Sequence, residues 1–323
     1  MRTRLTDLFG IRHPVILGGM ASGTDSRLAA AVSRAGGLGV LGASNLSPEA
    51  IEAEAARLRE LTPNPFGINL LLWSSASKVE VVLAQQPAVL STAWGDPTPH
   101  VDVAHEAGAL VMHMVNDVPG AIAAARAGVD VIVAQGAEGG GHVGLLSTIA
   151  LVPQVVDAVE DVPVVAAGGI ADGRGLAAAL ALGAEGVLMG TRFLATKEAP
   201  IPDGWKRAIL DARADETVRS PVIDLAYQAP WPEPAAVRAI RNAFLDRWLG
   251  REDEVRAMQG RLGQHLAEAR RQDDREEMAL MAGESVGLID DLPNAGEVVE
   301  RVVREAESLL PQLTARVIGR PVP

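Results

Sequence analysis

Short apolar runs recur along the first two-thirds of the chain, and alanine-rich stretches with charged residues on one side separate them. A short, continuously apolar run is typical of a strand buried on both faces of a parallel sheet. The runs are VILGG from Val15, GLGVLG from Gly37, FGINLLL from Phe66, AVLSTAW from Ala88, ALVMHMV from Ala109, DVIVAQG from Asp130, VPVVAAGG from Val162 and GVLMG from Gly186. The pattern therefore predicts eight strands.

The segments between these runs carry signals for the starts and ends of helices. Ser47, Asp117 and Asp172 are typical N-cap residues, because their side chains can accept a hydrogen bond from the first helical turn. Glycine, which tolerates the positive φ that follows many helices, ends four of the helical patterns, at Gly36, Gly108, Gly128 and Gly183. Eight strands alternating with helices predict a (β/α)8 TIM barrel, of the α/β class. An open, doubly wound sheet is the alternative.

After the eighth run the pattern changes. Residues 201–283 contain PWPEP, the amphipathic stretch AAVRAIRNAFLDRWL and the charged run EARRQDDREEM, and they show no clear strand pattern. We interpret this segment as a helical subdomain inserted after strand eight. The amphipathic stretch AGEVVERVVREAESLL would then supply the eighth barrel helix. The predicted organisation is a barrel formed by residues 1–200 and 284–311, an insertion at 201–283, and a surface tail at 312–323.

Composition narrows the classes of function. The 323 residues include 29 Lys and Arg against 41 Asp and Glu, for a net charge of −12, and no basic cluster. Nucleic acid is therefore not an expected partner, because phosphate binding needs concentrated positive charge. The absence of cysteine excludes disulfides, iron–sulfur clusters and thiol catalysis. No apolar run has the ~20 residues of a membrane helix, and the first residues lack a signal-peptide pattern, so we expect a cytoplasmic protein without a membrane partner.

Two glycine-containing strand ends predict a phosphate site. Gly168-Gly169 ends the seventh strand, and Gly190-Thr191 ends the eighth. In a TIM barrel the loops after these two strands commonly bind phosphate through backbone N–H groups and a short helix N-terminus. Glycine also ends strands simply to allow a tight turn. Its presence in both expected loops, with the Thr191 hydroxyl as a further donor, favours the phosphate site.

The segment QGAEGGGHVG at 135–144 follows the sixth strand. It contains the spacing G-x-G-x-x-G at Gly139, Gly141 and Gly144, but a dinucleotide fingerprint must open a helix at once and precede a strand that ends in an acidic residue. Here the next helix is expected near residue 147 and the next strand ends in AAGG, so we reject that interpretation. We instead expect a flexible glycine loop that carries His142 over the barrel mouth. There an imidazole can act as a base or donate a hydrogen bond to an anion.

The other histidines are less suited to chemistry. His13 precedes a proline at a strand entrance, and His100, His105 and His265 fall on helix patterns. His113 lies inside the fifth strand, where it can face either the core or the pocket. No strand end gathers histidines and carboxylates as a metal site does, so no metal is expected.

Together these residues resemble the nitronate monooxygenase family, formerly called 2-nitropropane dioxygenases. That family shares its FMN-dependent barrel with FMN-type enoyl-acyl-carrier reductases and some NADH:quinone reductases. The resemblance covers most of the chain. It rests on HPVILGGM, AVSRAGGLGVLG, PFGINL, VAQGAEGGGHVG, VPVVAAGGIADGRG, ALGAEGVLMGTRF and AGESVGLI.

The resemblance implies roles for individual residues. His142 would be the catalytic histidine beside the reactive edge of the flavin, and Ser285 is a further candidate for the flavin pocket. Gly168, Gly169, Gly190 and Thr191 would hold the FMN phosphate. The residues implied to contact the rest of FMN are Gly19, Met20, Asn69, Gln135, Gly136 and Gly141.

Two departures from the family pattern bear on the reaction. Gly19 stands where the first motif usually has proline, and STAWGDP at 91–97 replaces an S-F-H-F-G-like string of the best-defined nitronate monooxygenases. The first expectation is oxidation of alkyl nitronates with O2 to a carbonyl compound and nitrite. The alternative is an NAD(P)H-dependent reductase of enoyl thioesters or quinones. The use of NAD(P)H and the formation of a homodimer stay open.

Overall fold

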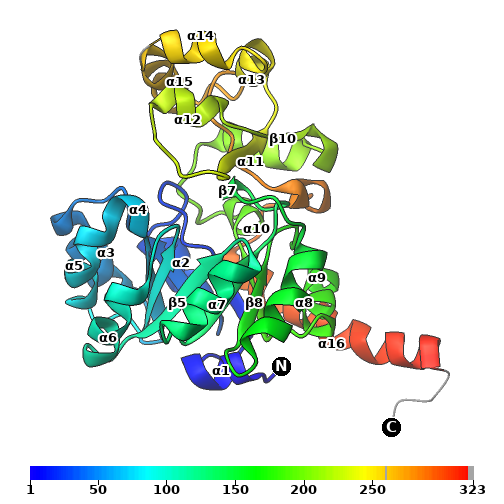
Figure 1. Ribbon diagram of the computed structural model, residues 1–323. Helices are drawn as coiled ribbons and strands as arrows, with labels where there is room; N and C mark the ends of the chain where they lie inside the picture. The colour runs from blue at the N-terminus through cyan, green and yellow to red at the C-terminus, as the bar shows by residue number, and fades with distance from the viewer. Residues whose placement is uncertain (259, 319–323) are drawn as a thin grey trace.

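An eight-stranded parallel barrel carries the functional end of the molecule (Figure 1). The computed structural model describes residues 1–258 and 260–318. The strands follow the order β1-β9-β8-β6-β5-β4-β3-β2, and a bridge between Ile16 and Leu38 closes the ring. Their bounds are β1 (Val15–Leu17), β2 (Gly39–Gly42), β3 (Phe66–Leu71), β4 (Val89–Ala93), β5 (Leu110–Val115), β6 (Val131–Gln135), β8 (Val164–Ala167) and β9 (Gly186–Met189). The predicted TIM barrel is confirmed.

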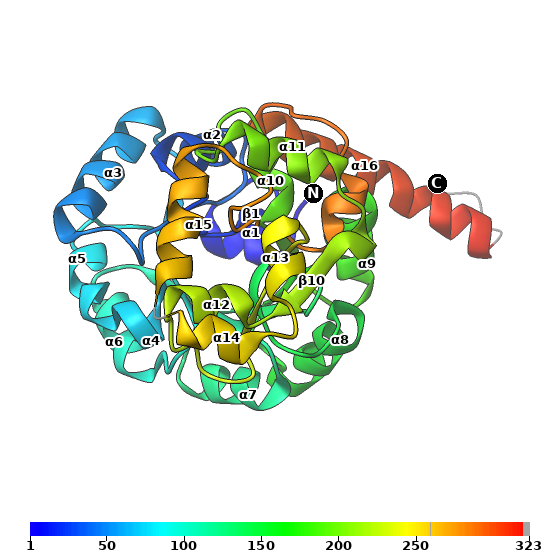
Figure 2. The ribbon, with the colours of Figure 1, turned by 90° about the horizontal axis from the view of Figure 1, so that it is seen from above.

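Helices cover the outside of the barrel between successive strands (Figure 2). They are α2 (Ser26–Arg34), α3 (Pro48–Leu61), α4 (Leu72–Ser75), η1 (Ala76–Lys78), α5 (Val79–Leu83), α6 (Thr98–Glu106), α7 (Val118–Arg126), α8 (Thr148–Val159), α9 (Gly173–Ala181), α10 (Thr191–Leu194) and α16 (Ala295–Ile318). The helix α16 packs against α9 and α2, as expected for the eighth barrel helix. None of the described helices is long and apolar enough to cross a membrane.

The predicted helix caps are present. Ser47, Asp117 and Asp172 each accept a hydrogen bond from a backbone amide in the first turn of α3, α7 and α9. The four predicted glycines at helix ends have φ between 78° and 93°, a region that L side chains rarely adopt. These local signals fix where each helix begins and ends, and so how long each connection to the next strand is.

Apolar side chains fill the inside of the barrel. Val40, Met112, Val133 and Leu188 are among those that meet there. Helix α1 (Arg4–Phe9) adds Leu5 and Phe9 to the same cluster, and Figure 1 places this helix at the end opposite the insertion. With one end filled in this way, the other end, where the strands have their carboxyl termini, is left for a ligand.

A second unit, formed by the segment after β9, lies over that carboxyl end (Figure 2). Its elements are α11 (Asp203–Asp211), η2 (Ala214–Glu216), β10 (Thr217–Ser220), α12 (Val222–Tyr227), β11 (Ala236–Ile240), α13 (Ala243–Trp248), α14 (Glu252–Ala257) and α15 (Arg261–Arg271), and the chain returns through η3 (Glu284–Leu288). It has its own apolar cluster, to which Ile223, Val237 and Phe244 belong. We keep 201–283 as its proposed extent.

The insertion is mainly helical, as expected, but the expectation that it contains no strand is wrong. The stretch AAVRAIRNAFLDRWL forms the strand β11 followed by the helix α13, and β11 pairs antiparallel with both β10 and β7 (Gly141–Val143). Asn242 divides the stretch, because its side chain caps α13 by accepting a hydrogen bond from Leu245. Both strand partners are distant in sequence, so this pairing overrides a helical periodicity that is local.

The predicted tail also differs from the structure. Residues 312–318 continue α16, and residues 319–323 lie outside the described part. Residues 312–317 are mostly exposed, so tertiary packing does not order them. A helix that has already formed adds one hydrogen bond for each residue it gains, which is sufficient to extend it through this segment.

Candidate active site

A cavity of about 660 Å³ lies at the carboxyl ends of the barrel strands, beneath the insertion. Its lining includes His142 and Ser285, and most residues that the sequence analysis assigned to FMN. These are Gly19, Met20, Asn69, Gln135, Gly141, Gly168, Gly169, Gly190 and Thr191. Gly136 does not line the cavity, because it packs against Thr148, whose hydroxyl would stand 2.1 Å from a Cβ placed on that glycine. The fold thus brings together residues from β3, β6, β7 and η3 and from the turns after β1, β8 and β9.

Two adjacent strand ends present free backbone amides to the cavity. Gly168 and Gly169 have φ values of 106° and 71°, a conformation that glycine adopts without strain. Among the described residues, no acceptor is found for the amides of Gly168, Gly169, Gly190 and Thr191. Gly168, Gly169 and Gly190 are partly exposed at the cavity, so their amides can donate to water or to a bound anion with several oxygen atoms.

Two amide side chains, on β3 and on β6, are held in fixed orientations at the cavity. Asn69 donates through Nδ2 to the Gly19 carbonyl (3.1 Å) and accepts from the Ser91 hydroxyl (2.9 Å). Gln135 accepts through Oε1 from Asn116 (2.9 Å), which leaves its Nε2 as a donor at the cavity wall. A planar ring with polar edges could be recognised by such groups.

His142 does not lie on a flexible loop, and this correction changes the picture of the site. It is the central residue of β7, opposite Val237 of β11. The residues just before β7 are also held, because the Glu284 amide donates to the Glu138 carbonyl at 2.9 Å. Glu138 in turn caps α8 by accepting from the Thr148 amide (2.9 Å) and hydroxyl (2.8 Å). The glycines here allow close crossing of chains rather than motion, since a Cβ on Gly140 would stand 2.6 Å from the Gly283 nitrogen.

The imidazole of His142 forms a pair with a carboxylate of the insertion. Its Nε2 lies 2.7 Å from Oδ1 of Asp224, and the two side chains are only 16% and 11% exposed. An ionised carboxylate can only accept, so Nε2 carries the proton and donates it to Asp224. Among the described residues, Nδ1 has no partner. It is therefore the nitrogen available to a ligand.

Aromatic rings surround this pair. The ring of Trp231 stacks on His142 with centroids 3.3 Å apart and an interplanar angle of 14°. Trp73 and Trp94 contact Trp231 at centroid distances of 4.8 and 5.8 Å. Trp94 has a φ of 53°, an unfavourable conformation for a bulky residue that costs on the order of 1–3 kcal/mol and tends to occur at functional sites.

The sequence analysis did not identify Asp224 or these tryptophans. One compositional signal was available in the sequence, because the chain has only five Trp and one Tyr. In the structure, four of the Trp and the Tyr line the cavity. Aromatic residues that are so rare in a chain are informative when they flank the strand ends, as Trp73 and Trp94 do. No comparable sequence signal marks Asp224.

A family model described as nitronate monooxygenase matches residues 2–77 and 73–305. The chain belongs to the nitronate monooxygenase family. It is an oxidoreductase, and the members of this family are flavoenzymes.

Relatives and solved structures agree over nearly the whole chain. A Mycobacterium tuberculosis protein named (3aS,4S,5R,7aS)-5-hydroxy-7a-methyl-1-oxo-octahydro-1H-indene-4-carboxyl-CoA dehydrogenase is 34% identical, with 98% of this chain and 99% of that protein covered. FabK from Thermotoga maritima superposes with a TM-score of 0.89 at 35% identity, covering 98% and 100% of the two chains. A nitroalkane oxidase from Streptomyces ansochromogenes has a TM-score of 0.82 at 30% identity, covering 95% and 99%.

The sequence left open whether His113 faces the core or the pocket. In the structure it does not line the cavity at the barrel mouth. It is 5% exposed, and its Nδ1 lies 2.8 Å from the Thr92 hydroxyl. Met112 and Met114, its neighbours along β5, face the barrel interior, so His113 faces the helices. Burial lowers the pKa of His113 to about 4.

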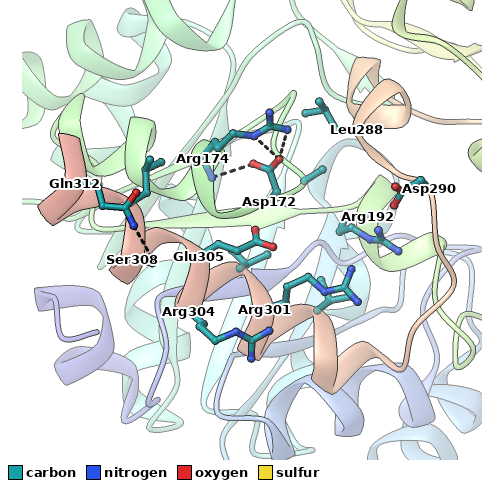
Figure 3. A pocket seen from close by; sticks show the side chains of 14 residues that line it. Asp172, Arg174, Arg192, Leu288, Asp290, Arg301, Arg304, Glu305, Ser308 and Gln312 are labelled. Atoms are coloured by element: carbon teal, nitrogen blue, oxygen red, sulfur yellow. Dashed lines mark hydrogen bonds and ion pairs between the residues drawn. The ribbon is translucent and has the colours of Figure 1, made fainter. Parts of the chain in front are cut away.

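A second groove, of about 680 Å³, lies outside the barrel between α9, η3 and α16 (Figure 3). Its charged side chains largely neutralise one another: Arg174 pairs with Asp172, and Arg192 and Arg301 both pair with Asp291. Among the described residues, no group of three or more His, Cys, Asp or Glu is placed to hold a metal. The cavity at the barrel mouth is therefore the candidate active site.

The buried His113 predicts an acid-dependent loss of stability. Its pKa in the folded state is lower than the ordinary value of about 6.5, so the unfolded chain binds the proton first as the pH falls. The stabilisation present above pH ~6.5 is then lost towards pH 4, by at most about 3 kcal/mol at ~1.4 kcal/mol per unit. Urea unfolding of wild type and His113→Gln between pH 7.5 and 4 measures the difference. An equally steep pH dependence in His113→Gln would contradict this assignment.

Proposed function

We propose that this protein is an FMN-dependent enzyme that oxidises alkyl nitronates with O2 to a carbonyl compound and nitrite. The observation that carries the proposal is the His142–Asp224 pair, held at the cavity wall with Nδ1 of the imidazole free. A nitronate is an anion, and its parent nitroalkane is a weak carbon acid. An imidazole whose positive charge is balanced by a carboxylate can take a proton from the nitroalkane and can donate a hydrogen bond to the nitronate.

The cavity suits FMN in particular. The unpartnered amides at Gly168–Gly169 and Gly190–Thr191 would hold one terminal phosphate, and the segment beyond them shows no adenine-binding βαβ unit. Gly19, Met20, Asn69, Gln135 and Gly141 would border the flavin. When bound, FMN supplies the electron transfer between the substrate and O2, and the protein supplies position and electrostatics.

His142 would have two proton-related tasks. With Nε2–H donated to Asp224, the lone pair on Nδ1 can take the α-proton of a nitroalkane. Once protonated, Nδ1–H can donate a hydrogen bond to an oxygen of the nitronate. Asp224 then balances the imidazolium charge, and the face of Trp231 adds a cation–π contribution of about 0.5–2 kcal/mol.

The three tryptophans give the substrate an apolar surrounding. Trp73, Trp94 and Trp231 together form a wall beside His142. Such a wall excludes water from the reacting carbon and strengthens the electrostatic contacts beside it. It also offers contact area to an alkyl chain of variable length.

A second candidate is an NAD(P)H-linked flavin oxidoreductase of acyl thioesters. It is favoured by the name of the Mycobacterium tuberculosis relative, a carboxyl-CoA dehydrogenase, at 34% identity over nearly the full chain. The same His142 would then polarise or protonate a carbonyl oxygen instead of a nitronate oxygen. The two candidates differ in what reduces the flavin.

The flavin spectrum therefore tests the proposed function. We expect the purified protein to release FMN on denaturation, to lose its oxidised flavin absorbance when mixed anaerobically with propyl-1-nitronate, and to form nitrite in air. NADH and NADPH should react far more slowly than the nitronate. Rapid bleaching by NAD(P)H with no reaction of the nitronate would support the second candidate and contradict the first.

Replacing His142 should damage the chemistry far more than flavin binding. A general base or positioned hydrogen-bond donor contributes typically ~10²–10⁴-fold to a rate, so His142→Ala should lower kcat/KM for a neutral nitroalkane at least about a hundredfold. The loss for the preformed nitronate should be smaller, because no proton has to be removed. FMN content per protein serves as the control, and near-full activity per bound flavin would remove His142 from the mechanism.

A further inference from the structure

One cation on the cavity wall has no partner of opposite charge. Arg270, near the end of α15, lines the cavity together with His142 and Asp224. Within the described part of the chain, its guanidinium makes one hydrogen bond, from Nη2 to the Ser22 carbonyl at 2.9 Å, although a guanidinium has five N–H donors. No carboxylate among the described residues forms an ion pair with Arg270, and burial lowers the pKa of its guanidinium.

A second donor beside Arg270 also lacks an acceptor. The guanidinium carbon lies 5.0 Å above the ring of Trp205. Trp205 lines the same cavity and is 2% exposed, and within the described residues its indole N–H finds no acceptor. The indole nitrogen itself is covered from solvent, so Trp205 contributes the ring face beneath the guanidinium rather than a donor to a ligand.

The position of Arg270 relative to His142 follows from helix α12. Asp224, which binds His142, and Tyr227, which lies beside Arg270, are three residues apart on α12. Residues at this spacing are neighbours on one helix face, about 5–6 Å apart at Cβ. Arg270 and the His142–Asp224 pair are thus connected through α12 and line the same cavity.

A cation that is partly withdrawn from water and has no ion-pair partner gains from a ligand that supplies the opposite charge. We propose that Arg270, whose guanidinium stacks on Trp205, forms a subsite for an anionic substituent of the substrate, while the reacting carbon lies at His142. This inference rests on the proposed function only for the reaction at His142, and not for the binding of the anionic substituent at Arg270. A guanidinium binds carboxylate and phosphate alike through paired N–H donors, so either group fits the subsite.

The test compares an anionic ligand with an uncharged one of similar shape. The affinities of the FMN-loaded protein for 3-nitropropionate and for 1-nitropropane are measured anaerobically by calorimetry, and an unchanged flavin spectrum after each titration shows that binding alone was read. Wild type should prefer 3-nitropropionate at least about tenfold, since one charge-assisted hydrogen bond is worth ~1.5–3 kcal/mol. Inorganic phosphate as a competitor then shows whether phosphate also occupies the subsite.

Two variants of adjacent arginines separate the subsite from general charge. Arg270→Gln should abolish the preference for 3-nitropropionate and leave the affinity for 1-nitropropane nearly unchanged. Arg271→Gln, which removes the same charge from an exposed residue paired with Glu268, should keep the preference. Arg270→Lys should keep part of it.

Three results would overturn the subsite: equal affinity of wild type for the two ligands, an undiminished preference in Arg270→Gln, or a fall in FMN affinity in Arg270→Gln with the ligand preference intact. The last would assign Arg270 to the flavin phosphate. A protein that shows the preference but does not turn over nitronates would refute the proposed function and leave the subsite standing.

Discussion

The hydrogen bond between His142 and Asp224 joins two parts of the molecule that fold from distant segments, and the geometry of the candidate site depends on it. His142 belongs to the barrel side, on β7, whereas Asp224 belongs to the insertion, on α12. The antiparallel pairing of β7 with β11 fixes the position of the His142 backbone, and the stacked Trp231 fixes the plane of the imidazole ring. The carboxylate then decides which ring nitrogen faces the cavity. Without the insertion, His142 would have neither a fixed tautomer nor a fixed orientation.

The barrel and the insertion contribute different kinds of groups to the cavity. The barrel end offers backbone amides and glycines, such as Gly169 and Gly190, that allow close approach of an anion and are insensitive to its detailed shape. The insertion contributes side chains: Asp224, Tyr227, Trp231 and Arg270 all come from it. In the proposed function, the barrel would support the flavin and the insertion would contact the substrate.

Features encoded locally could be predicted from the sequence. The eight strands, the caps at Ser47 and Asp172, and the glycines at helix ends follow from short apolar runs and from single residues whose preferences are strong. The cavity location followed from strand ends alone, since parallel strands in a barrel bring their carboxyl ends together. Asp224 could not be predicted, because it lies 82 residues from His142 and its register depends on a β7–β11 pairing. That pairing was hidden by the helical periodicity of AAVRAIRNAFLDRWL and by the glycine-rich sequence around β7.

The central claim is that Asp224 fixes the protonation and orientation of His142, and Asp224→Asn tests it most directly because the amide keeps the shape but removes the charge. A hydrogen bond to a charged group is worth ~1.5–3 kcal/mol, so kcat/KM for a neutral nitroalkane should fall about ten- to a hundredfold. The value for the preformed nitronate should fall less, and FMN content and the free energy of unfolding should stay near those of wild type. Unchanged kcat/KM for both substrate forms, in a protein that still requires His142, would contradict the account.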